Sequence, residues 1–172
     1  MRTSHRRAIL MLTLLGLSGC TTVPLMNKAE DLVQGLMVKT RTMGDRRLSD
    51  AATVSRELAC GTPGASAARL EDSSVLPERP KAGREIAHRV VLAACPLAPE
   101  LMAGTLTRRV SRQGRTLFED SVPYTLKPGR WSIDAFVGIP AQAEPGSYRL
   151  AVQFVRRGMR LETGSEFAVM AP

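Results

Sequence analysis

The thiol of Cys20 is the side chain whose neighbours most clearly specify a chemistry. It follows a basic start with three arginines, an apolar run from Ala8 to Leu17, and the small residues Ser18 and Gly19. The apolar run has ten residues, about half of the ~20 that a helix needs to span a bilayer permanently. This order of basic, apolar and small residues is typical of an export signal, and it places a nucleophilic thiol at the end of that signal.

Residues 1–20 resemble the signal of bacterial lipoproteins, both in this order and in the four residues that end with Cys20. The resemblance implies a diacylglycerol on the Cys20 thiol, cleavage before Cys20 and acylation of the new amine. Such an anchor holds a protein on a lipid bilayer because each buried methylene contributes ~0.8 kcal/mol. In that family an aspartate after the cysteine retains proteins in the inner membrane, so Thr21 implies an outer-membrane location. We expect the domain to face the periplasm, with the cell exterior as the alternative. The alternatives are an ordinary signal-peptide cysteine or an uncleaved anchor.

Two cysteines, Cys60 and Cys95, remain once the lipoprotein resemblance has assigned Cys20 to the lipid. An even number of thiols in an oxidising compartment favours a disulfide. We therefore predict a Cys60–Cys95 bridge, with two buried free thiols as the alternative. In the chain-entropy model, closing this separation of 35 residues stabilises the fold by ~3–4 kcal/mol. The bridge would join the N-terminal part of the chain to the main domain.

Side chains that could perform catalysis are sparse. His88 is the only histidine after the signal, and a single histidine cannot supply a two-histidine metal site. The apolar residues two positions away on each side favour a packed or edge-strand histidine over a catalytic one. Glu119 and Asp120 would point to opposite faces of a strand, so they could not easily act together. Glu71 and Asp72 lie in an expected loop, where solvated carboxylates are favoured over weak calcium binding. We therefore predict no catalytic residue, no metal and no cofactor.

The aromatic residues divide the chain, because all seven lie after residue 117. Large rings dominate core energetics, which places the main core in the C-terminal part. Helical spacing of apolar residues predicts a helix near 25–38. Ser49 as an N-cap and Gly61 as a terminating residue predict another near 49–60. The proline- and glycine-rich segment that follows predicts a loop with at most a short strand near Ser73–Leu76. The resulting division is a signal peptide at 1–19, a lipidated tether at 20–24, a helical segment at 25–60, a loop at 61–83 and a β domain at 84–172.

Apolar and polar residues alternate from Arg84 onward, which is the pattern of strands with one buried face. Turn-forming residues separate the apolar runs at Ser111–Gly114, Lys127–Gly129 and Arg156–Gly158. We therefore predict a mainly β fold, an antiparallel sandwich of six or seven strands preceded by one or two N-terminal helices.

The C-terminal part carries the run Pro145-Gly146-Ser147-Tyr148 and then a hairpin that ends near Phe167. This ending resembles that of bacterial immunoglobulin-like or macroglobulin-type β-sandwiches, over about residues 80–172. The resemblance implies that Tyr148 is a corner tyrosine whose hydroxyl hydrogen-bonds back to the connection between strands. Trp131 is expected to be a core ring of the sandwich rather than an exposed binding residue.

The whole chain has a net charge of +8, and loss of the three signal arginines leaves about +5. The basic residues alternate with apolar positions, which is typical of a solvated strand face; anionic lipid headgroups or an acidic partner are the alternative counterparts. Nucleic acid is not expected as a partner, because the export signal gives the wrong location and no platform of aromatic and basic residues occurs. We predict a non-enzymatic scaffold or accessory subunit of a cell-envelope assembly, such as a secretion, transport or appendage complex, that acts through protein contacts. The alternatives are a lipoprotein that binds a small ligand or glycan, and a hydrolase of envelope polymers or its modulator.

Overall fold

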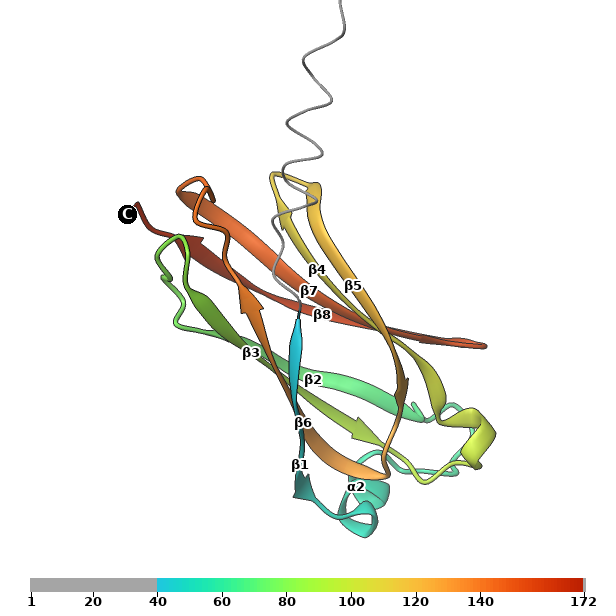
Figure 1. Cartoon of the computed structure of the whole chain (residues 1–172). Helices are drawn as coiled ribbons and strands as arrows, with labels where there is room; N and C mark the ends of the chain where they lie inside the picture. Colours follow the sequence, from blue (N-terminus) through green and yellow to red (C-terminus); the bar gives the residue numbers. More distant parts are fainter. Residues whose placement is uncertain (1–39, 172) are drawn as a thin grey trace, which may run out of the picture.

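Two antiparallel sheets of four strands each form the fold of residues 40–171, the part of the chain that the computed structural model describes (Figure 1). The first sheet has the strand order β1-β6-β3-β2, and the second has the order β5-β4-β7-β8. The elements are β1 (Arg41–Ser49), α2 (Ala51–Glu57), β2 (Ala68–Leu76), β3 (Glu85–Ala94), the short 3-10 helix η1 (Pro99–Leu101), β4 (Ala103–Arg112), β5 (Arg115–Thr125), β6 (Gly129–Gly138), β7 (Gly146–Arg156) and β8 (Met159–Val169). The fold is therefore mainly β, as predicted.

The inner faces of the two sheets pack against each other because their strands alternate apolar and polar residues. Strand β3 shows this alternation clearly, since Ile86, Val90 and Leu92 are all completely buried. Two apolar clusters fill the space between the sheets, one around Leu92 and Phe154 and the other around Ile86 and Leu150. Phe154 and Leu150 lie on β7 of the second sheet, so each cluster draws residues from both sheets.

The two long sides of the sandwich are closed in different ways. On the side of β2 and β8, backbone bonds join the sheets; for example, the amide of Ala168 donates to the carbonyl oxygen of Glu78 at 2.9 Å. On the side of β1 and β5, the carboxylate of Asp45 accepts a hydrogen bond from the Tyr124 hydroxyl at 3.0 Å and pairs with Lys127 at 2.6 Å. Backbone therefore seals the first side, whereas side chains bridge the second.

Glycine is required at two connections. The hairpin between β4 and β5 turns through Gln113 and Gly114, which have φ values of 51° and 79°, the geometry of a two-residue hairpin turn. Gly129 begins β6 with a φ of 105°, and a Cβ atom there would lie 2.6 Å from the carbonyl oxygen of Ser49. Any other residue at this position would collide with the end of β1.

The prediction of six or seven strands is corrected to eight among the described residues. The additional strands are β1, within the expected helical segment 25–60, and the nine-residue β2, within the expected loop 61–83. Both lie at the edges of the first sheet, where pairing with a neighbouring strand supplies structure that the local pattern does not show. The helix expected near 49–60 is present as α2, and the helix expected near 25–38 lies outside the described residues.

Candidate functional site

A cavity of about 370 Å³ lies between the sheets at one end of the sandwich. The β4–β5 hairpin and the β6–β7 connection form this end, and helix α2 lies at the opposite end (Figure 1). Apolar side chains from both sheets make up most of the wall, namely Val110, Leu117, Val137, Ile139, Phe167 and Val169. Small-molecule sites in proteins typically enclose about 300–1,000 Å³, so the cavity is large enough to hold part of a small ligand.

Polar side chains gather at the hairpin and the connection: Arg112, Gln113, Arg115, Gln142 and Glu144. Arg112 forms an ion pair with the carboxylate of Glu144 and donates from Nη2 to the carbonyl oxygen of Pro145 at 3.3 Å. Its guanidinium carbon lies 5.6 Å from the centre of the Tyr148 ring. The bond with Glu144 raises the pKa of Arg112 above its ordinary value, so this cation stays charged.

Tyr148 makes the contact that the corner-tyrosine resemblance implies. Its hydroxyl donates to the carbonyl oxygen of Glu144 at 2.7 Å, which ties the β6–β7 connection back onto β7. The Tyr148 ring stacks on Phe167, with ring centres 5.5 Å apart, and burial raises the pKa of the phenol. These contacts hold one side of the cavity in place.

A polar layer crosses the core between the two apolar clusters. It contains His88 of β3 and Arg108 of β4, which are 0% and 1% exposed. Nε2 of His88 lies 3.0 Å from the hydroxyl of Ser73, and that hydroxyl lies 2.7 Å from the hydroxyl of Ser165 on β8. His88, Ser73 and Ser165 thus link β3, β2 and β8 by hydrogen bonds through the interior.

Burial governs the charge states in this layer. It lowers the pKa of His88 to about 3, and the nearby Arg108 charge contributes to the shift. Burial also lowers the pKa of Arg108, whereas the carboxylate of Asp120, directly opposite on β5, opposes that shift. Among the described residues, Nδ1 of His88 and Nε and Nη2 of Arg108 have no hydrogen-bond partner. His88 is therefore neutral and enclosed, the packed strand histidine that its neighbours favour.

Strand β5 forms an open edge of the second sheet, since its hydrogen-bonded neighbour within residues 40–171 is β4 alone. Pro123 has no amide hydrogen, and prolines in strands occupy positions whose N–H side faces away from the partner strand. Glu119 and Ser121 lie four and two residues before Pro123, so their amides face the same way. β1 is also an edge strand, but two irregularities interrupt its register. The edge of β5 therefore offers main-chain groups to a further strand.

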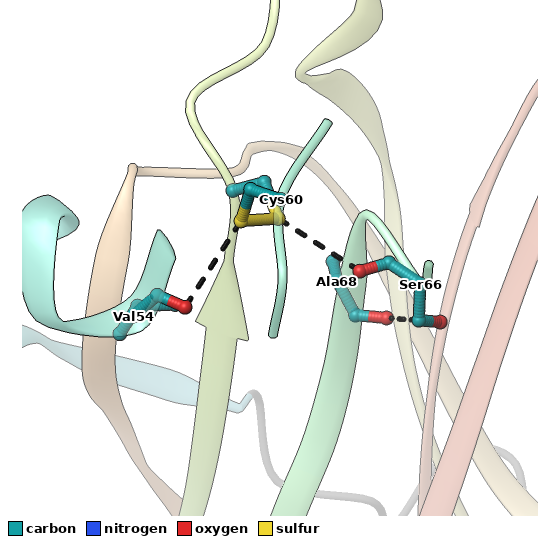
Figure 2. The surroundings of a disulfide bond; sticks show 5 residues. Val54, Cys60, Ser66 and Ala68 are labelled. Carbon is teal, nitrogen blue, oxygen red and sulfur yellow. Dashed lines mark hydrogen bonds between the residues drawn. A yellow bond between two sulfur atoms is a disulfide. The ribbon is translucent and has the colours of Figure 1, made fainter. Parts of the chain in front are cut away.

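A disulfide between Cys60 and Cys95 joins the segment after α2 to the end of β3, as the sequence predicts (Figure 2). The two Cα atoms are 5.7 Å apart, within the usual range for disulfides. Sγ of Cys60 lies 4.0 Å from the carbonyl oxygen of Val54 in α2, and Val54 and Leu58 pack with Ala93 of β3. The bridge therefore holds α2 against the first sheet.

Arg130 reinforces this end of the fold. Its Nε donates to Glu71 of β2 and its Nη2 donates to Glu57 of α2, each at 2.5 Å. These bonds, with Glu71 first, raise the pKa of Arg130, and the bond to Arg130 lowers the pKa of Glu71. Glu71, expected as a carboxylate of a solvated loop, instead lies on β2 and pairs with Arg130.

The other residues that the sequence singled out are dispersed. Glu119 pairs with Arg109 at 2.7 Å on the exposed face of β5, whereas Asp120 lies opposite the buried Arg108. Trp131, expected as a core ring, is only partly buried because it lies near the start of β6, where its Nε1 donates to the carbonyl oxygen of Pro128. The structure therefore brings none of these side chains to the cavity.

Sequence reasoning missed Arg108, although a signal for it was present. Leu106 and Val110 mark the buried face of β4, and Arg108 lies two residues from each, so strand periodicity places it on the same face. The cavity has no comparable signal, because its wall combines residues from five strands, β4 to β8. Cys20, the expected lipidation site, lies outside the described residues.

Residues 40–171 were also considered for membrane-spanning helices and for metal ligands. None of the helices there has the length and apolar character that crossing a membrane requires. The same residues contain no group of three or more histidine, cysteine, aspartate or glutamate side chains placed to hold a metal ion.

Comparison with known proteins finds no matching family model and no matching curated protein. Among solved structures, the sporulation control protein Spo0M from Bacillus subtilis is 14% identical, with a TM-score of 0.42, over 62% of this chain and 51% of that one. The alkylpurine DNA glycosylase AlkC from Pseudomonas fluorescens is 18% identical, with a TM-score of 0.41, over 62% of this chain and 31% of that one. A conjugative transposon lipoprotein from Bacteroides eggerthii is 13% identical, with a TM-score of 0.36, over 60% of this chain and 98% of that one. The chain thus spans about half of the length of Spo0M and about a third of that of AlkC.

Proposed function

We propose that this chain is a lipid-anchored outer-membrane protein that serves as a non-enzymatic accessory subunit of a cell-envelope assembly. In this proposal, its immunoglobulin-like sandwich binds a partner protein by accepting a strand beside β5. The observation that carries the proposal is the open edge of β5, where the amides of Glu119 and Ser121 face away from β4, while backbone bonds seal the opposite side. An extended partner segment would gain main-chain hydrogen bonds there.

The side chains of β5 define what the partner strand should look like. Phe118, Val122 and Tyr124 pack against the core but remain partly exposed. A partner strand with apolar residues on its inward face would cover them. Asp120 lies between Phe118 and Val122 on the same face, so the partner residue beside it is expected to be polar or basic. The Glu119–Arg109 pair on the outward face would tolerate varied residues.

The proposed anchor supports this role physically. Acyl chains on Cys20 would hold the domain at the membrane and raise its effective concentration near other membrane-bound subunits. A weak edge-to-strand contact would then suffice to keep the assembly together.

Purification from membranes in mild detergent tests the proposal with two variants at one position. Ser121→Pro removes an outward-facing amide, whereas Ser121→Ala removes only the hydroxyl that lies 2.8 Å from the Thr107 hydroxyl. The wild-type and Ser121→Ala proteins should recover a partner in stoichiometric amount, and Ser121→Pro should lose it. Isolation of the wild type as a lone monomer, or retention of the partner by Ser121→Pro, would contradict the proposal.

A further inference from the structure

The cavity at the β4–β5 hairpin end separates an apolar interior from a charged rim. We infer that it binds an amphiphile that carries an acyl chain and an anionic headgroup. This inference concerns a different surface from the β5 edge, and it stands whether or not a partner strand binds there. It rests on the composition of the wall, on Arg112 at the rim, and on the place where the chain enters the sandwich.

The wall suits a hydrocarbon chain. Val110 and Leu117 of the second sheet and Val137 of the first offer only apolar groups to the space between the sheets. Burying an acyl chain there is favourable by about 0.8 kcal/mol for each methylene removed from water. A sugar would need polar partners along the wall and a free aromatic face, but Tyr148 and Phe167 already stack on each other.

Arg112 suits an anionic headgroup. Its side chain lines the cavity, is 26% exposed and pairs with Glu144, whose own side chain is 72% exposed. An ion pair open to solvent contributes only ~0–1 kcal/mol, so a ligand carboxylate or phosphate could displace Glu144 from Arg112 at little cost. The Arg112 fork would then hold the headgroup through two parallel charge-assisted hydrogen bonds.

The chain enters the sandwich close to this cavity. Arg41, at the start of β1, pairs with Phe136 of β6, the residue next to cavity-lining Val137. Cys20 precedes Arg41 by 21 residues, a length that spans at most ~75 Å when fully extended. A domain anchored through Cys20 therefore stays within reach of membrane lipids and of its own acyl chains. Either source would supply the same ligand chemistry.

Titration calorimetry with dodecanoate tests the inference on the mature chain, residues 20–172, with Cys20→Ser and an ordinary cleavable signal. Dodecanoate should bind, and uncharged dodecanol should bind at least tenfold more weakly. Arg112→Gln should weaken dodecanoate binding at least tenfold, and Leu117→Trp, which places a large ring in the cavity, should abolish it. Arg109→Gln is the matched control, because Arg109 lies on the same strand but pairs with Glu119 outside the cavity, and it should bind as the unsubstituted chain does.

Lipidated protein in nanodiscs then distinguishes the sources. The protein's own acyl chain is the occupant if two results are found together. The lipidated protein binds dodecanoate more weakly than the Cys20→Ser chain does, and no lipid co-purifies with the Cys20→Ser chain. Co-purification of phospholipid or free fatty acid with the Cys20→Ser chain, and its loss in Leu117→Trp, identifies a lipid from the envelope. The inference is overturned if dodecanoate fails to bind the Cys20→Ser chain at millimolar concentration. It is also overturned if the folded Arg112→Gln and Leu117→Trp proteins bind dodecanoate as tightly as the unsubstituted chain.

Discussion

Burial of His88 predicts a pH-dependent stability that a single substitution should remove. The imidazole is 0% exposed, and burial, with a contribution from Arg108, lowers its pKa from 6.5 to about 3. The unfolded chain therefore binds a proton between these two values that the folded chain does not bind. The free energy of unfolding is consequently greatest above pH 6.5 and falls as the pH drops toward 3.

The size of the effect follows from the pKa of the unfolded chain. A solution at about pH 5 is ~1.5 pH units below the pKa of the imidazole in the unfolded chain. Each unit corresponds to ~1.36 kcal/mol of unfolding free energy. The folded protein should therefore lose about 2 kcal/mol between pH 7 and pH 5, which lowers the Tm by roughly 4–8 °C. Carboxylates with lowered pKa values, such as Glu71 and Asp134, lose their contribution mainly below this window.

Urea denaturation of the wild type and of His88→Gln at both pH values provides the assay. The introduced glutamine side chain cannot titrate but can still hydrogen-bond to Ser73, so the variant should show little change between pH 7 and pH 5. The two proteins share every other titrating group. The difference between their changes in unfolding free energy from pH 7 to pH 5 therefore isolates the contribution of His88. An equal pH dependence in both proteins would refute the reasoning.

Three further predictions concern stability. Replacing both Cys60 and Cys95 by serine should lower the free energy of unfolding by ~3–4 kcal/mol, measured by chemical denaturation; a loss below about 1 kcal/mol would contradict the role given to the bridge. Gly129→Ala should lower the free energy of unfolding by about 1–3 kcal/mol, because the φ of Gly129 is 105° and an added Cβ would meet the Ser49 carbonyl oxygen. Gly114→Ala should lower it less in the same assay, because Gly114 has a φ of 79° but open space around it. Arg108→Met should leave the Tm unchanged or raise it, because it removes buried donors without partners; a large loss of Tm would show that the polar layer is needed for folding.

Strand periodicity carries most of what the sequence reveals about this fold. Ile86, Val90 and Leu92 alternate strictly, and all three are buried in β3. β1 escapes this reasoning because the exposed Arg46, Arg47 and Leu48 show no alternation; its structure comes from pairing with β6.

The candidate site was less accessible to sequence reasoning. The pairing of Cys60 with Cys95 could be predicted from the expected oxidising compartment and the even number of remaining thiols, and this reasoning needs no geometry. The polar layer could have been inferred in part, because Arg108 shares a face with apolar neighbours. The cavity and the open edge depend on which strands become neighbours, and local patterns do not encode that arrangement.

Photo-crosslinking in intact cells tests the central claim most directly, with p-benzoylphenylalanine in place of Glu119 on β5 or of Glu78 on the sealed side. The account predicts a discrete membrane-bound adduct with one envelope protein from the β5 position and none from the Glu78 position. Equal adducts from both positions, or a protein that stays uncrosslinked and washes from membranes in plain buffer, would contradict it.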